Sequence, residues 1–173
     1  MIELIVGGAR SGKSSHALRV AESLPGNRHF IATAEARDGE MADRIARHQK
    51  ERSASWQLTE ETCCLSGQTP RFAEPDVVLV DCLTLWVANW LGSGNADGWP
   101  EEKRRFLDGL AASRAHWLLV SNETGMGVVP ADRLSRQFVD ESGRLHQELS
   151  AIAHRVTLVT MGIPRVLKRR EDE

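Results

Sequence analysis

The stretch Gly7-Gly-Ala-Arg-Ser-Gly-Lys-Ser14 decides the fold. It matches the pattern G-x-x-x-x-G-K-[ST] in full, and it lies between a short apolar run at 2–6 and a segment with a helical apolar face. The glycines of such a loop let backbone N–H groups surround a phosphate at the positive end of the following helix. A chance match in a structural turn is the alternative, but the flanking elements favour a phosphate-binding P-loop. The sequence therefore predicts a nucleoside triphosphate site.

The same octapeptide contains G-x-A-x-x-G, a weak form of the dinucleotide-binding fingerprint. Lys13 and Ser14 argue against that interpretation, because a dinucleotide pyrophosphate needs no lysine there. We expect Lys13 to reach the β- and γ-phosphates as a catalytic residue and the Ser14 hydroxyl to hold Mg²⁺. The predicted nucleotide contacts in this loop are Gly7, Gly8, Ala9, Arg10, Ser11, Gly12, Lys13 and Ser14.

Apolar runs alternate with amphipathic segments along the rest of the chain. We expect strands at 2–6, 28–33, 77–81, 117–121 and 156–160, and helices after the P-loop and at 39–52, 83–91, 101–113 and 131–154. This alternation indicates βαβ units and a mostly parallel sheet flanked by helices. The sequence thus predicts one α/β domain at 1–167, with the RecA-like fold of P-loop NTPases. The glycine-rich segment 92–100 is expected to be a mobile surface loop, and 168–173 a charged tail that is either solvated or in contact with a partner.

Composition limits the class of protein. The 173 residues, 41% hydrophobic and 27% charged with a formal net charge of −2, fit one globular domain and give no sign of a nucleic-acid partner. Three cysteines, two of them adjacent and none in C-x-x-C, support neither a disulfide framework nor a zinc site. No signal peptide or membrane-spanning stretch is recognisable, so we expect a cytoplasmic protein without membrane insertion.

Asp81 follows the most apolar run of the chain. Ligands of parallel α/β sheets bind beyond the carboxyl ends of the strands, and a carboxylate at this position is the expected Mg²⁺ ligand of a P-loop enzyme, directly or through water. The alternative is that Asp81 caps a helix starting at Cys82.

His48 lies on one helical face with Met41, Ile45 and Arg52. Arg44 and Arg52 flank it four residues away on either side, and two guanidinium groups so close would lower the pKa of the imidazole. A neutral imidazole can attack phosphorus. The alternative is a structural histidine on a packed helix face.

Asn122 and Glu123 follow another buried strand, in the segment S-N-E-T-G-M-G-V-V-P at 121–130. Their position favours a substrate-binding pair or a general base at the active edge of the sheet. A glycine-rich connection with a capping Asn is the simpler alternative.

Five stretches in this order make the chain recognisable. They are G-G-A-R-S-G-K-S at 7–14, I-A-T-A at 31–34, E-M-A-D-R-I-A-R-H at 40–48, V-D-C-L-T at 80–84 and the segment at 121–130. From residue 1 to about residue 164 the chain resembles the bifunctional adenosylcobinamide kinase / adenosylcobinamide-phosphate guanylyltransferase family of cobalamin biosynthesis.

The resemblance implies two reactions. Members phosphorylate the corrinoid adenosylcobinamide with ATP or GTP, and then transfer GMP from GTP to that phosphate through a guanylylated histidine, which here is His48. It also implies a homotrimer. Beyond the P-loop, the implied nucleotide contacts are Ala32, Thr33, Ala34, Arg52, Glu60 and Asp81.

Two rival functions remain at this point. A plain P-loop small-molecule kinase would leave His48 merely structural. A regulatory GTPase or ATPase switch is disfavoured, because Asp81 is followed by Cys-Leu-Thr instead of D-x-x-G and the chain has no N-K-x-D motif.

Overall fold

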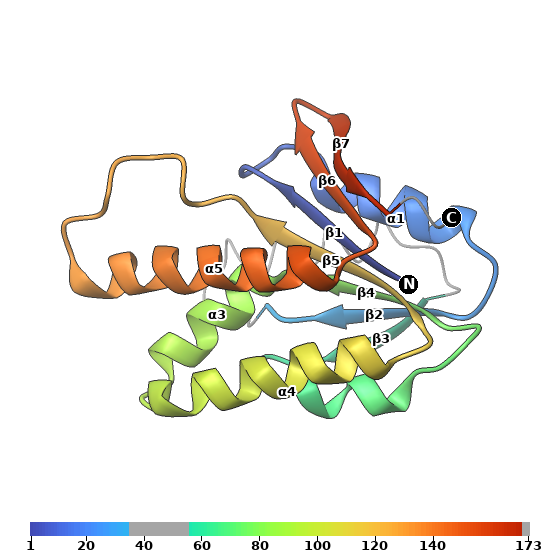
Figure 1. Cartoon of the computed structure of the whole chain (residues 1–173), viewed down its shortest axis with the longest axis horizontal. Helices are drawn as coiled ribbons and strands as arrows, with labels where there is room; N and C mark the ends of the chain where they lie inside the picture. Colours follow the sequence, from blue (N-terminus) through green and yellow to red (C-terminus); the bar gives the residue numbers. More distant parts are fainter. Residues whose placement is uncertain (35–55, 171–173) are drawn as a thin grey trace.

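The computed structural model describes residues 1–34 and 56–170 of the chain (Figure 1). The helix expected at 39–52, with His48 and Arg52, lies outside the described residues. Within the described part, no helix is long and apolar enough to cross a membrane.

A single sheet of seven strands forms the centre of the molecule, in the order β3-β2-β4-β5-β1-β6-β7 (Figure 1). All neighbouring pairs are parallel except β6 and β7, which are antiparallel. The predicted mostly parallel α/β sheet is thereby confirmed. The strands are β1 (Ile2–Gly7), β2 (Arg28–Ala32), β3 (Trp56–Glu60), β4 (Val77–Asp81), β5 (His116–Asn122), β6 (Arg155–Thr160) and β7 (Ile163–Arg169).

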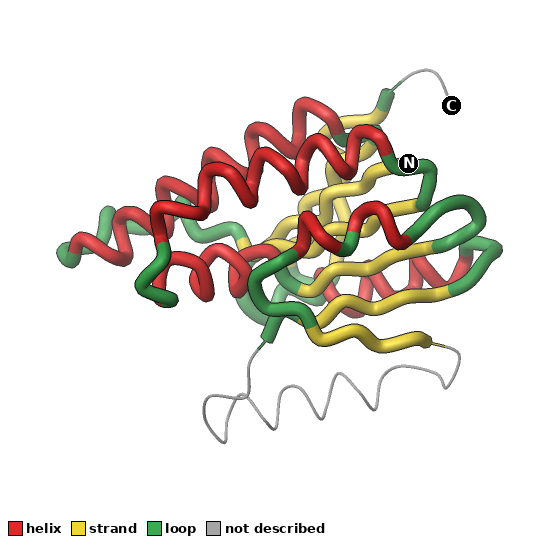
Figure 2. Tube along the Cα trace, turned by 90° about the horizontal axis from the view of Figure 1, so that it is seen from below, coloured by secondary structure: helices red, strands yellow, loops and turns green. Residues whose placement is uncertain are grey.

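Helices cover both faces of the sheet (Figures 1 and 2). Helix α1 (Lys13–Ser23) packs on one face through Ala17, Leu18 and Ala21. The other face carries α3 (Leu83–Gly92), α4 (Trp99–Ala112) and α5 (Arg133–Ile152), with three short 3-10 turns, η1 (Leu65–Gly67), η2 (Thr69–Arg71) and η3 (Ala96–Gly98). Because successive strand residues point to opposite faces, fully apolar strands such as β4 feed both cores at once.

The sequence did not indicate strand β3, at the edge of the sheet. Its residues are half-buried or exposed, including Leu58 at 46% exposure, so it lacks the apolar run by which the buried strands were recognised. Edge position explains the weak pattern, because only one side of the strand pairs with a neighbour.

The prediction that 156–160 is the last strand was wrong. A two-residue turn at Met161 and Gly162 leads into β7. Both residues have positive φ, 52° and 79°, as the central positions of a type I′ hairpin turn require. Methionine at the first of these positions gives no turn signal in a sequence. Strand β7 continues to Arg169, so the first two residues of the predicted charged tail pair with β6.

The prediction of a mobile loop at 92–100 was wrong for its last residues, which are ordered and start a helix. Trp99 is 2% exposed, begins α4 and packs edge-on against Trp86, with 4.7 Å between ring centroids. An indole of this size gains enough from burial to fix a segment that its glycines would otherwise leave free.

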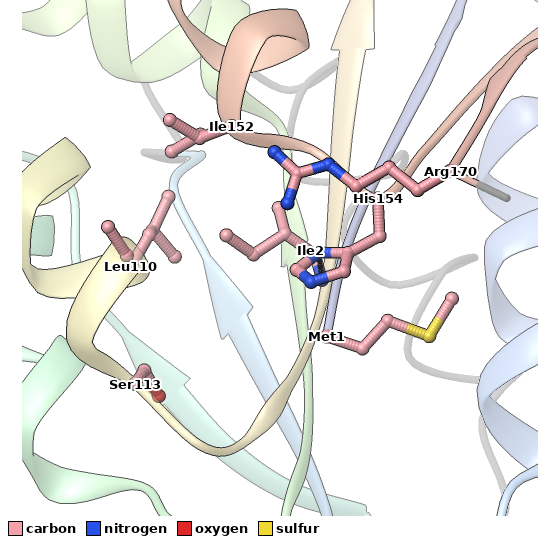
Figure 3. Close-up of a pocket in the computed structure, with 8 residues that line it drawn as sticks. Met1, Ile2, Leu110, Ser113, Ile152, His154 and Arg170 are labelled. Atoms are coloured by element: carbon pink, nitrogen blue, oxygen red, sulfur yellow. Dashed lines mark hydrogen bonds between the residues drawn. The ribbon is translucent and has the colours of Figure 1, made fainter. Parts of the chain in front are cut away.

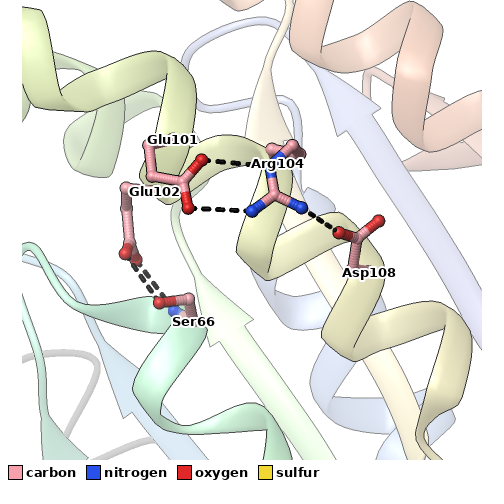
Figure 4. A network of polar contacts seen from close by, with 5 residues as sticks. All are labelled: Ser66, Glu101, Glu102, Arg104 and Asp108. Atoms are coloured by element: carbon pink, nitrogen blue, oxygen red, sulfur yellow. Dashed lines mark hydrogen bonds and ion pairs between the residues drawn. The ribbon is translucent and has the colours of Figure 1, made fainter.

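The segment between β3 and β4 is held to α4 by a buried carboxylate (Figure 4). Glu102 accepts hydrogen bonds from the Ser66 backbone N–H at 2.8 Å and from the Ser66 hydroxyl at 2.6 Å. Its neighbour Glu101 instead lies on the surface and pairs with Arg104. The buried interaction joins residues 36 positions apart, whereas the exposed one stays within one helix.

We predict that Glu102→Ala destabilises the protein by about 2 kcal/mol, because it leaves two buried Ser66 donors without an acceptor. Glu101→Ala, one residue away, serves as the control and changes stability little, since exposed ion pairs contribute weakly. Urea unfolding of both variants measures the difference. Equal losses in the two variants would contradict the assigned role of Glu102.

Candidate nucleotide site

The P-loop leaves β1 at Gly7 and enters α1 at Lys13, at the carboxyl edge of the sheet. Gly12 has φ of 90°, and a side chain on it would bring Cβ within 3.2 Å of Gly162 Cα. Both the backbone conformation and the available space therefore require glycine here. Lys13 is 8% exposed and its Nζ donates to the Gly8 carbonyl at 3.1 Å, so the ammonium lies over the loop. A cation in that position suits phosphate oxygens.

The two strands that pair with β1 hold the P-loop at both ends. Just after β5, the Glu123 N–H donates to the Gly7 carbonyl at 3.0 Å. From the turn after β6, the Gly162 N–H donates to the Ser11 carbonyl at 2.8 Å. The loop is thus fixed by residues more than 100 positions away in the sequence.

Asp81 lies at the same edge, at the end of β4. Strand β5 separates β4 from β1, since Val120 pairs with both Asp81 and Ile5. The residue that caps α3 is Cys82, and no side chain makes a capping hydrogen bond there. The helix-capping alternative for Asp81 therefore finds no support, and the residue is half-buried at the carboxyl end of its strand.

Thr33 fixes the backbone beside Asp81. Its hydroxyl donates to the Cys82 carbonyl at 2.7 Å and accepts from the Cys82 N–H at 2.8 Å, while its own N–H donates to the Asp81 carbonyl at 3.3 Å. Thr33 is fully buried. This hydroxyl is engaged with backbone, so Thr33 positions Asp81.

Ala32 and Glu60 lie at the same carboxyl edge of the sheet, farther from the P-loop than Asp81. Ala32 pairs with Asp81 on one side and with Glu60 on the other. Ala34 is the last described residue before 35–55. The described residues predicted to contact nucleotide thus share one edge of the sheet, from Glu60 on β3 to Ser14 on α1.

A divalent cation at this edge would find few protein ligands. Among the described residues, no three histidine, cysteine, aspartate or glutamate side chains gather into a metal site. Magnesium commonly binds through one or two protein oxygens together with phosphate oxygens and water. One hydroxyl, on Ser14, and one carboxylate, on Asp81, fit that preference.

Asn122 and Glu123 turn out to have different surroundings. The Thr84 hydroxyl accepts from both the backbone N–H and the side-chain Nδ2 of Asn122, at 3.1 and 2.8 Å. Asn122 therefore ties the end of β5 to the start of α3, in line with the structural alternative. Glu123 remains half-buried, and its Oε1 accepts from the Gly125 N–H at 2.7 Å.

Sequence reasoning missed His146. Its Nε2 lies 2.7 Å from the hydroxyl of Ser121, which is 1% exposed at the end of β5. Burial lowers the pKa of His146, and the nearby Glu123 opposes this shift only in part. The imidazole is therefore neutral at neutral pH. Only its position on α5 against β5 reveals the contact, because 25 residues separate the two side chains.

A cavity of about 330 Å³ lies at the opposite, amino edge of the sheet (Figure 3). Its lining includes Ile2, Leu110, Ile152, His154 and Arg170. Ile2 begins β1 and His154 precedes β6, so this cavity is a strand length away from the P-loop and contributes nothing to the nucleotide site.

We predict that Gly162→Ala weakens nucleotide binding several-fold, because an L-residue at φ of 79° strains the turn that anchors Ser11. Gly94→Ala is the matched control: its φ is 77° and, as at Gly162, no atom lies within 4 Å of an added Cβ. Both variants should lose about 1 kcal/mol of stability. Equilibrium dialysis with GTP measures the affinity, and an equal affinity loss in both variants would contradict the anchoring role.

We also predict an acid limit to stability. The folded-state pKa of His146 and that of His16 are both below the ordinary value of 6.5, chiefly through burial. As the pH falls through 6.5, the unfolded chain binds more protons at these two histidines than the folded one does. The free energy of unfolding is therefore unaffected by them above that pH and decreases below it. Urea midpoints of wild type between pH 7.5 and 5.5 should fall more steeply than those of His146→Gln, and the double variant with His16→Gln should be flatter still. A wild-type slope retained in the double variant would refute this assignment.

Comparison with solved structures supports the fold. The chain aligns with an ATPase of a bacterial type III secretion system at TM-score 0.56 and 11% identity, over 92% of this chain and 51% of that one. A Pyrococcus horikoshii OT3 protein aligns at TM-score 0.58 and 8% identity, over 99% and 87% of the two chains. The predicted P-loop NTPase fold is thus confirmed.

Comparison of sequences identifies the family. The chain is 45% identical to the bifunctional adenosylcobalamin biosynthesis protein CobP of Pseudomonas aeruginosa, over 97% of this chain and 98% of the relative. It is 39% identical to the CobU protein of Salmonella typhimurium, over 94% and 97% of the two chains. The family model described as cobinamide kinase / cobinamide phosphate guanyltransferase matches residues 3–167. These matches confirm the predicted family and enzyme class, and with them nucleotide binding: the chain belongs to the cobinamide kinase / cobinamide phosphate guanyltransferase family.

Proposed function

We propose that one triphosphate site, built on the P-loop, serves two successive reactions on a corrinoid. The first phosphorylates adenosylcobinamide with ATP or GTP, and the second transfers GMP from GTP to the new phosphate. The observation that carries this proposal is Lys13, buried over a P-loop fixed at both ends, in a chain that matches the family over residues 3–167.

In the kinase reaction, the acceptor hydroxyl attacks the γ-phosphorus and gives up its proton to water, the bond to the β,γ-bridging oxygen breaks, and a nucleoside diphosphate leaves. Lys13 offsets the charge that moves onto the leaving diphosphate, and the backbone N–H groups of the loop hold its oxygens. Ser14 and Asp81 would hold Mg²⁺, which supplies further charge neutralisation when bound. Thr33 keeps Asp81 in place for that role through the backbone of Cys82.

In the transfer reaction, the neutral imidazole of His48 attacks the α-phosphorus of GTP and pyrophosphate leaves. The corrinoid phosphate then attacks the same phosphorus and displaces the histidine, giving adenosylcobinamide-GDP. The P-loop that held the β- and γ-phosphates during phosphorylation holds the departing pyrophosphate here. Arg52, Ala32, Ala34 and Glu60 are the further nucleotide contacts of this proposal.

Several finer assignments rest on the sequence. The homotrimer is implied by the family resemblance, and the cytoplasmic location by the three cysteines without a disulfide pattern. A single domain is proposed on the same basis, and because β7 runs to Arg169 it includes the first two residues of the predicted tail.

The test separates the two reactions. With α-phosphate-labelled GTP and no corrinoid, wild type should acquire an acid-labile protein label, and His48→Ala should acquire none while still phosphorylating adenosylcobinamide. Lys13→Ala should lose both activities by at least about 100-fold, since it removes the phosphate-binding cation. His116→Gln, at the amino edge of the sheet, is the control and should label normally.

Two outcomes would count against the proposal. Full guanylyl transfer by His48→Ala would leave a monofunctional kinase with a structural histidine as the better description of that residue. Labelling that persists in Lys13→Ala would separate the transfer site from the P-loop.

A further inference from the structure

Five exposed apolar side chains flank the P-loop, and we propose that they dock the apolar face of the corrinoid acceptor. We call this set the apolar rim: Met126, Val128, Val129, Met161 and Ile163. The inference rests on the proposed function, in that it assumes a corrinoid acceptor at the P-loop, and it adds the surface by which that acceptor is held.

The exposure of the rim is unusual for this chain. The five side chains are 96%, 86%, 82%, 74% and 67% exposed, and they are the five most exposed large hydrophobic residues among those described. Isolated surface hydrophobics need no explanation, but the five most exposed ones lie in the loop after β5 and at the β6–β7 turn, and such a grouping indicates a surface that another molecule covers. The two methionines also suit a ligand of irregular shape, because their side chains are flexible and polarisable.

Both loops of the rim belong to the nucleotide site by position. One follows β5 and the other joins β6 to β7, and β5 and β6 are the two strands that pair with β1. Figure 1 shows both loops projecting past the carboxyl ends of the strands, with the P-loop between them. Glu123 and Gly162, which begin the first loop and form the second, are hydrogen-bonded to the P-loop backbone. A molecule that spans the two loops would therefore lie next to the P-loop.

The two halves of the site edge differ in chemistry. On the side of β4 and β3, the strands end in the carboxylates of Asp81 and Glu60, which suit a metal ion and the polar groups of a nucleotide. On the side of β5 and β6, the edge continues into the apolar rim. A nucleoside triphosphate needs cations and hydrogen-bond donors, which the five rim side chains lack.

A corrinoid matches the rim better than a nucleotide does. Its macrocycle is broad and carries methyl groups on its faces and amides around its periphery, so a large part of its surface gains from leaving water. Docked on the rim, the ring would present its hydroxyl-bearing arm to the P-loop from the side opposite Glu60. Nucleotide and acceptor would then occupy different halves of the same edge.

The experiment measures corrinoid affinity directly, with adenosylcobinamide as the probe and its visible absorbance as the signal in equilibrium dialysis. Two double variants place charge in the rim: Met126→Asp with Val128→Asp, and Met161→Asp with Ile163→Asp. Each should raise the Kd and the KM for adenosylcobinamide roughly tenfold or more, because carboxylates replace apolar contacts, and should leave the KM for GTP within about twofold of wild type.

Leu167→Asp is the matched control. Leu167 is 57% exposed on the same hairpin. It lies near the carboxyl end of β7, which runs antiparallel to β6, and therefore toward the amino edge of the sheet, away from the P-loop. It should bind and phosphorylate the corrinoid as wild type does. Met161→Leu, which keeps an apolar side chain, should also retain affinity. Thermal unfolding checks that the variants are folded, as expected for side chains that make little contact.

The outcomes separate this inference from the proposed function. If wild type phosphorylates adenosylcobinamide and both double variants keep its affinity, the rim is not the docking surface while the function stands. If the variants change mass in light scattering and lose GTP affinity as well, the rim is an interface between copies of the chain and the inference is overturned. If wild type neither binds nor phosphorylates the corrinoid, the proposed function itself fails.

Discussion

The nucleotide site depends on two backbone hydrogen bonds that hold the P-loop between β5 and the β6–β7 turn. Glu123 and Gly162 donate to the carbonyls of Gly7 and Ser11, at the two ends of the loop. A phosphate-binding loop works only if its N–H groups already point at the ligand, because reorganisation on binding would use up part of the binding free energy. The parallel pairing of β1 with β5 and β6 supplies that rigidity.

Asp81 is also held in place before any ligand binds. This carboxylate lies on β4, separated from β1 by one intervening strand, and no side chain caps the helix that follows it. Thr33 and Asn122 are both committed to hydrogen bonds around Cys82 and Thr84, and these bonds tie β2, β4, β5 and α3 together. Thr33 and Asn122 thus stabilise the backbone beside Asp81, and the side chains of both have hydrogen-bond partners.

Much of this architecture could be predicted from the sequence, and the exceptions have physical reasons. Strand β4 was evident because a strand buried on both faces must be apolar throughout. Strand β3 was not, because an edge strand can be polar and still pair. Strand β7 depends on a turn with Met161 in the left-handed region, a conformation that its residue type does not favour. Trp99 seemed to belong to a glycine-rich loop until its burial against Trp86 fixed it at the start of a helix.

The candidate site divides in the same way. The sequence alone determined that a triphosphate binds, because the P-loop octapeptide makes its contacts through its own backbone and through Lys13, all within eight residues. It also named Asp81 by its place at the end of a strand, and His48 by a helical face and a family resemblance. Only the tertiary structure decided that Thr33 positions Asp81, that His146 meets Ser121, and that the β6–β7 turn supports the P-loop and brings apolar side chains beside it. These relations join residues 25 to 151 positions apart, and such contacts leave no periodic trace in the sequence because they depend on which strands become neighbours in the sheet.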